Sequence, residues 1–363
     1  MKSIFICCGN LKAGGAERVI SILSNKFVDK GLNVDLYTWY KTDIFYEFDE
    51  RVQIHQIPIE SKRTGYYGQM KWFRKEAKKK CPEVILSFLA PFNILTVFSL
   101  VGLKIPVLVA ERNDPYFVSP SNNAFWKIIR NIAYKMADGI LVQTQVNKSH
   151  FPEYLQNKST IIYNPVTFSE TKIGIALNTP KRKEIVSVTR LEKQKNIDML
   201  IQAYSIFQKN HPDYTLTIYG DGAERNRLEK KIKEMNLQDK IFLQGRKQNV
   251  HDLIIGASIF AMASNFEGMS NSLIEAMCLG LPCISTRVSG AVDLIKNDDN
   301  GLLVDIGNVN QLSIALSKLA EDDKFRLKIG KNATRLYDFL NVDIVAQEWL
   351  EYISKYTYEN KTY

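Results

Sequence analysis

Cysteine and histidine are scarce in this sequence, with five cysteines and four histidines among 363 residues. The number of cysteines is odd, and Cys7 and Cys8 are adjacent in an apolar run, which argues against a disulfide framework. The spacing of these residues does not suit a zinc site either. We therefore expect reduced thiols, a cytoplasmic protein and no bound metal ion.

Long uninterrupted apolar runs are also missing. The first apolar run, residues 4 to 8, is too short for a signal peptide and is not followed by a cleavage pattern. Residues 84 to 103 have about the length of a membrane span, but Pro91 and Asn93 interrupt them. We predict a buried strand followed by a buried helix there, rather than a membrane-spanning segment.

Strand-like and helix-like patterns alternate along the chain, and the alternation restarts after Asn164 and Pro165. Such alternation predicts α/β domains whose parallel sheets are covered by helices on both faces. We predict two doubly wound, Rossmann-like domains facing each other across a cleft, with ligands beyond the carboxyl ends of the strands. The expected strands are residues 3–8, 33–39, 84–88, 107–110 and 139–142, then 184–189, 215–219, 240–243, 259–262 and 282–285.

The positive charge is concentrated in one segment. Residues 1 to 165 carry +8 of the net charge of +9, and residues 61 to 80 hold eight basic side chains against Glu76 alone. Aromatic side chains alternate with these charges, as in segments that lie on an anionic membrane. A solvated helix face is the plain alternative, and we expect no nucleic-acid partner because no other segment resembles such a module. We assign the following residues to a membrane surface: Lys71, Trp72, Phe73, Arg74, Lys75, Lys78, Lys79 and Lys80.

Glycines follow two of the expected strands. Gly14 and Gly15 open a helix after the first strand, where free backbone amides favour an anion, although a plain tight turn fits equally well. Gly220 and Gly222 flank Asp221 after the strand at 215–219. Asp221 is placed either to hydrogen-bond a ligand or to cap the next helix.

Two cations and two carboxylates stand at regular spacings in the second half. Arg190 and Lys195 follow the strand at 184–189, and a pair of cations suits a diphosphate. Glu267 and Glu275 are eight residues apart, which spans at most about 12 Å if helical. We expect a helix from Ser270 to about 279, with one carboxylate toward each end of a ligand of that length. The segment between them supplies Gly268 and backbone amides of Met269, Ser270 and Asn271 for the intervening phosphates.

These four elements, G-G-A-E-R, R-x4-K, G-D-G and E-x7-E, together resemble the family-4 retaining glycosyltransferases of the GT-B fold. The resemblance covers nearly the whole chain and includes the segment A-Q-E-W-L-E-Y-I-S-K-Y, which is similar to the final helix that packs back on the first domain. The segments I-L-S-F-L-A-P-F-N-I, V-A-E-R-N-D-P-Y and R-L-E-K-Q-K-N resemble bacterial N-acetylhexosaminyltransferases that extend lipid-linked oligosaccharides. The implied domains are 1–167 for the acceptor, 168–342 for the nucleotide sugar, and a crossover helix at 343–363.

The resemblance also implies roles for matching residues. Arg190 and Lys195 would hold the donor diphosphate, Glu267 would contact the transferred sugar and Glu275 the ribose. The catalytic residues would be Arg190, Lys195 and Glu267, and the donor site would comprise Gly14, Gly15, Gly220, Asp221, Glu267, Gly268, Met269, Ser270, Asn271 and Glu275. No cofactor and no metal is implied. The expected donor is a UDP-sugar rather than a GDP-sugar, and the expected acceptor is a lipid-linked saccharide at the inner face of the cell membrane.

One position departs from the family pattern. Many relatives have a histidine near the reacting sugar where this chain has Arg112, followed by Asn113, and we place both on the acceptor side. Arginine cannot act as a base at neutral pH.

Three other interpretations of the sequence are a nucleotide-sugar epimerase of the same fold, a non-enzymatic membrane-surface protein, and a dinucleotide oxidoreductase. The last lacks an acidic residue at the end of the second strand, where the chain reads T-W-Y.

Overall fold

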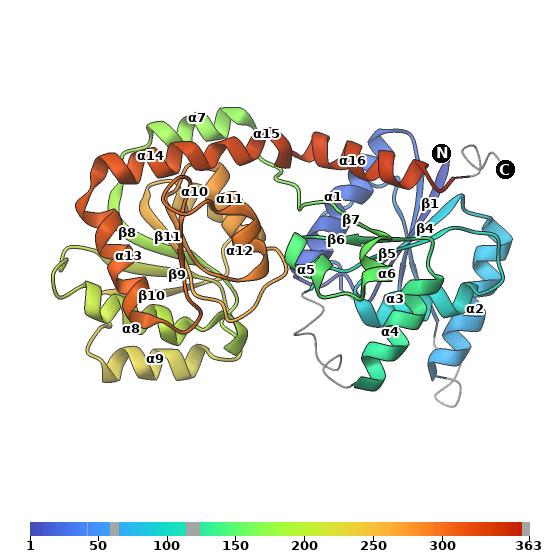
Figure 1. Cartoon of the computed structure of the whole chain (residues 1–363), viewed down its shortest axis with the longest axis horizontal. Coiled ribbons are helices and arrows are strands. Elements are labelled where there is room, and N and C mark those ends of the chain that lie inside the picture. The colour runs from blue at the N-terminus through green and yellow to red at the C-terminus, as the bar shows by residue number, and fades with distance from the viewer. Residues whose placement is uncertain (42, 59–64, 114–123, 358–363) are drawn as a thin grey trace. The chain divides into compact units, whose positions relative to one another are not determined.

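The computed structural model describes residues 1–41, 43–58, 65–113 and 124–357. The chain divides into two compact units (Figure 1). Unit 1 consists of Met1–Thr167 and Asn341–Tyr363, and unit 2 of Phe168–Leu340. The chain therefore leaves unit 1, builds unit 2 and returns.

Unit 1 contains, in its described residues, a seven-stranded parallel sheet with the order β3-β2-β1-β4-β5-β6-β7. Its strands are β1 (Ser3–Cys8), β2 (Asn33–Thr38), β3 (Gln53–Gln56), β4 (Val84–Phe88), β5 (Val107–Ala110), β6 (Gly139–Val142) and β7 (Ser159–Ile161). Its helices are α1 (Gly15–Asp29), α2 (Gly65–Lys80), α3 (Ala90–Leu100), α4 (Ala124–Met136), α5 (Gln145–Ser149), α6 (Glu153–Gln156) and α16 (Val342–Ser354). The strand order reverses between β1 and β4, which is a doubly wound topology.

Both faces of this sheet are covered, which explains the continuous apolar strands. One face packs under α1 and α16, and the other packs under α2, α3 and α4 (Figure 1). On α16, Trp349 is fully buried and its ring stacks on Phe88 of β4, with the ring centroids 5.8 Å apart. The C-terminal segment therefore completes the core of unit 1, as predicted.

The apolar stretch at residues 84 to 103 is divided between β4 and α3, as predicted. Asn93 is buried in α3, and its Nδ2 donates to the carbonyl oxygen of Ala110 and to the Tyr134 hydroxyl. Within the described ranges, no helix has the length and apolar content needed to span a bilayer.

Unit 2 contains a six-stranded parallel sheet in the part of the chain described, with the order β10-β9-β8-β11-β12-β13. Its strands are β8 (Arg182–Val188), β9 (Thr215–Tyr219), β10 (Ile241–Gly245), β11 (Ala257–Met262), β12 (Cys283–Thr286) and β13 (Leu302–Val304). Its helices are α7 (Glu170–Asn178), α8 (Ile197–Phe207), α9 (Arg225–Glu234), α10 (Val250–Ile254), α11 (Asn271–Cys278), α12 (Ser289–Leu294), α13 (Val309–Glu321), α14 (Asp323–Ala333) and α15 (Tyr337–Leu340), with short 3-10 turns η1 (Lys193–Lys195) and η2 (Thr334–Leu336). The order reverses between β8 and β11, which are hydrogen-bonded neighbours.

The ten expected strands are present, with ends that differ by up to two residues. Three further strands, β3, β7 and β13, were not predicted. All three are short and lie at sheet edges. The sequence of β3 is Q-I-H-Q, which has only one apolar residue because an edge strand contributes little to the core.

Candidate functional site

Three loops of unit 2 leave the carboxyl ends of β8, β9 and β11, which are adjacent strands. This is the position at which open parallel sheets bind ligands. The loops carry the R-x4-K, G-D-G and E-x7-E residues, respectively. The topology therefore brings together motifs that are up to about eighty residues apart in the sequence.

The loop after β8 is hydrogen-bonded to the loop after β9. The Leu191 amide donates to the Asp221 carbonyl at 3.0 Å, and the Glu224 amide donates to the Leu191 carbonyl at 2.9 Å. Gly220 has a φ of +143°, and a Cβ there would lie 1.7 Å from the backbone oxygen of Thr189. A Cβ on Gly222 would lie 2.4 Å from the Leu191 oxygen. Both glycines are required for this close approach of two backbones.

The loop after β8 also contacts the loop after β11. The Asn265 amide donates to the Gln194 carbonyl, and Gln194 Nε2 donates to the Phe266 carbonyl, each at 2.8 Å. Asn196 Nδ2 donates to Asn265 Oδ1 at 2.9 Å. Asn196 is also the N-cap of α8 and has a left-handed φ of 44°, which asparagine tolerates. The three loops thus form one hydrogen-bonded unit.

Lys195 and Glu267 form an ion pair between these two loops. Both side chains are mostly buried, and Glu267 Oε1 also accepts a hydrogen bond from the Ser264 hydroxyl at 2.9 Å. Two of the three predicted catalytic residues are therefore in direct contact. Ser264 supports this carboxylate, and the sequence analysis did not identify it.

Arg190 differs from Lys195 in its surroundings. Its side chain is 51% exposed, and Nη1 donates to Glu192 Oε1 at 2.6 Å. An exposed pair of this kind contributes little free energy. The guanidinium can therefore exchange Glu192 for an anionic ligand at small cost, whereas Lys195 is already held in place.

The segment from Gly268 to Asn271 leads into α11. The Ser270 hydroxyl accepts a hydrogen bond from the Leu273 amide at 3.4 Å, so Ser270 is the N-cap, and Met269 is buried behind it. A Cβ on Gly290 would lie 2.5 Å from the Gly268 carbonyl oxygen, so α12 packs closely against this segment. The N-terminus of α11 is thereby fixed beside Glu267.

Glu275 lies in α11 and is buried. Its Oε2 is 2.9 Å from Nε2 of His251, which belongs to α10. The ring of Phe168 packs edge-on against the His251 imidazole, with centroids 5.4 Å apart. His251 was not predicted, because a single histidine in a helix of five residues, V-H-D-L-I, gives no signal that it faces a carboxylate.

Asp221 has a local role in the structure. Its Oδ1 accepts hydrogen bonds from the Gly222 amide at 2.8 Å and from Arg225 Nε at 3.0 Å. These bonds, led by the one from Arg225, lower the pKa of the Asp221 carboxyl. Of the two roles considered for Asp221, the contacts support stabilisation of the turn before α9.

The remaining predicted site residues belong to unit 1. Gly14 is the N-cap of α1 and Gly15 is its first residue, and the Gly14 carbonyl accepts a hydrogen bond from the Tyr46 hydroxyl at 3.0 Å. Arg112 follows β5, is buried, and donates from Nη2 to Asn164 Oδ1. Asn113, the next residue, is exposed.

Arg112 is next to a second buried charge, Glu111. The Tyr134 hydroxyl donates to Glu111 Oε2 at 2.7 Å, and the Arg112 and Asn113 amides also bond this carboxylate. Burial raises the pKa of the Glu111 carboxyl, although Arg130 opposes the shift. Burial lowers the pKa of the Arg112 guanidinium to about 9, which leaves it charged at neutral pH. A buried cation at this position can bind an anion or a sugar hydroxyl, but it cannot act as a base at neutral pH.

The eight residues assigned to a membrane surface differ in exposure, and all lie on α2. Phe73 is fully buried in the core of unit 1, so its assignment to the surface is corrected. Trp72 packs partly against that core. Arg74 donates to the Ser99 and Val101 carbonyls at the end of α3, and Lys80 pairs with Asp35 at 2.5 Å. Lys80 is exposed although it is paired, and four other exposed lysines lie along one side of the helix: Lys71, Lys75, Lys78 and Lys79. Lys62 and Arg63 lie outside the described residues.

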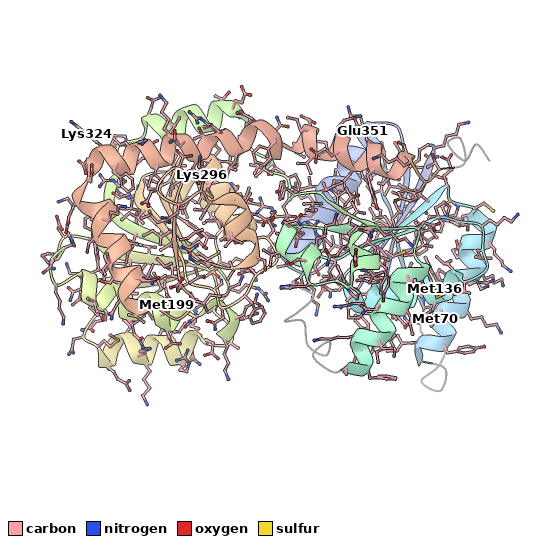
Figure 2. All side chains as sticks on the ribbon, in the orientation of Figure 1. Met70, Met136, Met199, Lys296, Lys324 and Glu351 are labelled. Atoms are coloured by element: carbon pink, nitrogen blue, oxygen red, sulfur yellow. The ribbon has the colours of Figure 1, made fainter. Side chains whose placement is uncertain are left out.

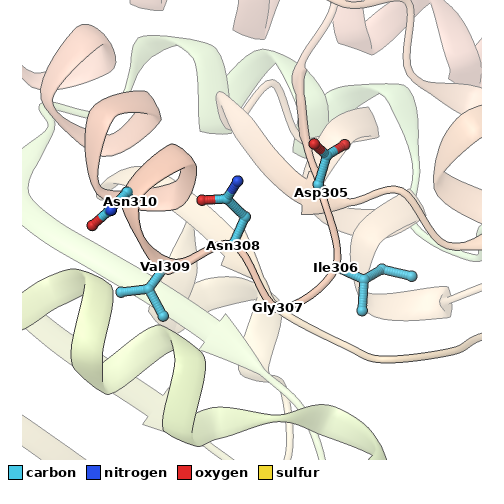
Figure 3. Close-up of a pocket in the computed structure, with 6 residues that line it drawn as sticks. All are labelled: Asp305, Ile306, Gly307, Asn308, Val309 and Asn310. Carbon is cyan, nitrogen blue, oxygen red and sulfur yellow. The ribbon is translucent and has the colours of Figure 1, made fainter.

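A hollow elsewhere in unit 2 lies where the chain passes from β13 into α13 (Figure 3). Six consecutive residues line it, from Asp305 to Asn310. Asn308 caps α13, and Asp305 accepts a hydrogen bond from Gln311 Nε2 at 2.9 Å. None of the predicted site residues contributes to this hollow, so it is separate from the three loops.

The chain matches known protein families over most of its length. Residues 168–336 match the family model of glycosyl transferases group 1, and residues 13–170 match the model of glycosyltransferase family 4. The chain is 32% identical to the N-acetylgalactosamine-N,N'-diacetylbacillosaminyl-diphospho-undecaprenol 4-alpha-N-acetylgalactosaminyltransferase of Campylobacter jejuni. The alignment covers 97% of this chain and all of the relative. The chain belongs to the family-4 glycosyltransferases.

A second Campylobacter jejuni relative of this family-4 glycosyltransferase is 28% identical over 98% of the chain and 99% of the relative. It is named GalNAc-alpha-(1->4)-GalNAc-alpha-(1->3)-diNAcBac-PP-undecaprenol alpha-1,4-N-acetyl-D-galactosaminyltransferase. Among solved structures, the Anabaena protein Alr3699/HepE in complex with UDP aligns with a TM-score of 0.81 at 17% identity, over 98% of this chain and all of that one. Sucrose-phosphate synthase from Thermosynechococcus elongatus aligns with a TM-score of 0.79 at 19% identity, over 98% of this chain and 99% of that one. The predicted GT-B fold and the family resemblance are both confirmed.

Proposed function

We propose that this glycosyltransferase transfers a hexose or N-acetylhexosamine from a UDP-sugar to a lipid-linked saccharide. The observation that carries the proposal is the hydrogen-bonded set of three loops in unit 2, which places Lys195, Glu267 and Arg190 around the carboxyl ends of β8 and β11. The names of the two Campylobacter relatives, both of which act on undecaprenol-linked saccharides, support the acceptor class. The UDP bound to the Anabaena protein supports the nucleotide.

The proposed chemistry follows from the charges in the three loops. Departure of the sugar leaves negative charge on the diphosphate, and the mostly buried ammonium of Lys195 and the exposed guanidinium of Arg190 stabilise that charge. Glu267, already held by Ser264 and Lys195, contacts the transferred sugar. The bond from the anomeric carbon to the phosphate oxygen breaks, and the acceptor oxygen bonds to that carbon on the same face. The leaving phosphate oxygen takes the proton of the acceptor hydroxyl, so the configuration is retained without a protein nucleophile.

Further features of the proposal concern the surroundings of the reaction. Glu275, buried beside His251, binds the ribose hydroxyls of the donor. The exposed lysines of α2 hold the enzyme on anionic lipid at the inner face of the membrane. Arg112 and Asn113 face the acceptor, and no metal ion is needed because the cations of the loops neutralise the diphosphate.

Transfer to a defined acceptor tests this proposal. The purified enzyme is mixed with UDP-GalNAc, UDP-GlcNAc, UDP-glucose or GDP-mannose, each with a polyprenyl-diphosphate-linked saccharide, and the product is analysed by mass spectrometry. We expect transfer from a UDP-sugar, an α-linkage in the NMR spectrum, and the same rate in EDTA. Arg190→Ala should reduce turnover by orders of magnitude while leaving the fold intact.

Other outcomes would identify a different protein. A change of sugar stereochemistry without acceptor would identify an epimerase. Vesicle binding without transfer from any nucleotide sugar would leave only a membrane-surface protein. A β-linked product would exclude retention, and loss of activity in EDTA would exclude metal independence.

A further inference from the structure

Helix α4 of unit 1 exposes an apolar stripe to solvent. The side chains of Phe125, Ile128, Ile132 and Met136 are each between 47% and 62% exposed. Their spacings of three, four and four residues place them on one side of the helix. Met136, at the end of this stripe, is labelled in Figure 2.

The opposite side of α4 is already used by the core. Ala133 and Tyr134 are fully buried there. A surface helix normally has one apolar side against the core and a polar side toward water. Scattered exposed apolar residues are ordinary, but four in a continuous row mark a surface that binds a partner.

The stripe lies on the same side of unit 1 as a positively charged surface, from which α3 separates it. Helix α3 packs against both α2 and α4, and these three helices cover the same face of the sheet (Figure 1). Arg74 fixes α2 to the end of α3 through the Ser99 and Val101 carbonyls. The outward side of α2 carries Lys71, Lys75, Lys78 and Lys79, none of which forms an ion pair with a described residue.

The charges indicate which partner covers the stripe. The sequence of α4, A-F-W-K-I-I-R-N-I-A-Y-K-M, contains no acidic residue, and the single acidic residue of α2, Glu76, lies 3.9 Å from Lys80. A second copy of this chain would bring two basic surfaces together, which is unfavourable. An anionic bilayer presents a layer of negative head groups above an apolar interior, which matches lysines beside an apolar stripe.

We propose that α4 inserts Phe125, Ile128, Ile132 and Met136 into the acyl boundary of an anionic membrane, while the lysines of α2 contact the head groups. This inference rests on the membrane association in the proposed function, which was assigned to α2 alone, and extends it to α4. The apolar side chains of α4 would contribute binding free energy that persists at high salt, whereas the contribution of the α2 lysines would be screened by salt.

The test compares three variants of the full chain on vesicles of phosphatidylcholine with and without phosphatidylglycerol, at low and high salt. Ile128→Ser with Ile132→Ser removes the centre of the stripe. Ile314→Ser with Leu327→Ser, on α13 and α14 of unit 2, is the matched control, because those residues are at least as exposed. Lys71→Glu with Lys75→Glu changes the charge of α2.

We expect the α4 variant to lose about tenfold or more in partitioning at both salt concentrations. The α2 variant should lose binding mainly at low salt, and the control should bind as the wild type does.

A label measures insertion directly. In a Cys81→Ser background, because Cys81 is the exposed thiol, a fluorophore at Ile132→Cys should be quenched by brominated lipid. The same fluorophore at Ile314→Cys should not. Equal quenching at both positions would overturn the proposal.

Other outcomes separate this inference from the proposed function. Unchanged binding of the α4 variant, with binding lost in the α2 variant, would refute insertion and leave the membrane association standing. Unchanged binding of both variants would refute the association as well. A wild-type dimer that the α4 variant dissociates would assign the stripe to a second copy instead. Transfer to a soluble short-chain acceptor should be the same in the wild type, the α4 variant and the control, and far-UV circular dichroism should be the same in all variants, which confirms that they fold.

Discussion

Lys195 and Arg190 are both proposed to bind the donor diphosphate, but the structure predicts that only Lys195 also stabilises the fold. Lys195→Met leaves the mostly buried Glu267 carboxylate without its cation. Breaking a buried pair costs about 3–5 kcal/mol, and the remaining hydrogen bond from Ser264 and the partial exposure reduce this to about 2–3 kcal/mol. Arg190→Met breaks only an exposed pair with Glu192, so the change should lie within about 1 kcal/mol.

A double variant isolates the pair. In Lys195→Met with Glu267→Gln, no charge remains buried, so at least about 1 kcal/mol of the loss should be recovered. Activity should not be recovered, because both groups are part of the proposed site. Lys195→Met and Arg190→Met should each also bind UDP more weakly, as titration calorimetry would measure.

The assay must report on unit 2 alone, because a chain with two units need not unfold in one step. Native-state hydrogen exchange of the peptides containing β8 and β11 meets this need. The reasoning is refuted if Lys195→Met is no more destabilising than Arg190→Met, or if the double variant is as unstable as the sum of its single changes.

Four other predictions follow from single features. Gly220→Ala should destabilise unit 2 by about 3 kcal/mol or more, since its Cβ would meet the Thr189 oxygen, whereas Gly307→Ala, at a φ of +79° in open space, should cost only about 1–2 kcal/mol in urea unfolding. Burial raises the pKa of the Glu111 carboxyl above its ordinary 4.5, so the stability contributed by this group is present below pH 4.5 and is lost as the pH rises. The urea midpoint of the wild type should therefore fall with rising pH relative to that of Glu111→Gln. Parallel curves of midpoint against pH would contradict this. Only Cys81 of the five cysteines is exposed, and burial raises the pKa of the other four thiols, so a thiol reagent such as Ellman's should modify one thiol per native chain and all five after denaturation. His251→Ala should raise the Kd for UDP because it removes the imidazole whose Nε2 lies 2.9 Å from the Glu275 carboxylate, while His251→Gln, which keeps a polar group there, should bind more nearly as the wild type does.

Much of the fold could be predicted because buried parallel strands are written as apolar runs, such as V-I-L-S-F for β4. The strands that were missed lack such runs, since β3 is polar and β7 and β13 have three residues each.

In α2, the periodicity of the helix decides which residues face water. The composition of the segment was informative, but it did not reveal that Phe73 faces the core while Lys71 and Lys75 face outward.

The motifs of the site were predictable because the carboxyl ends of adjacent parallel strands share one edge. Their pairing was not. Lys195 and Glu267 are 72 residues apart, and their contact depends on hydrogen bonds between two loops that have no sequence pattern of their own. His251 is a similar case, because its role depends on Glu275 in another helix.

The return of α16 to unit 1 has a consequence for the order in which the protein folds on the ribosome. Residues Phe168–Leu340 are an uninterrupted stretch, so unit 2 can complete its core as soon as that stretch has emerged. Unit 1 is begun first but must wait for Trp349 to cover Phe88, and throughout the synthesis of unit 2 one apolar face of its sheet is covered by α1 alone. Nascent chains that stop before α16 therefore carry a finished unit 2 and an open unit 1, and it is the open unit that chaperones and proteases would engage.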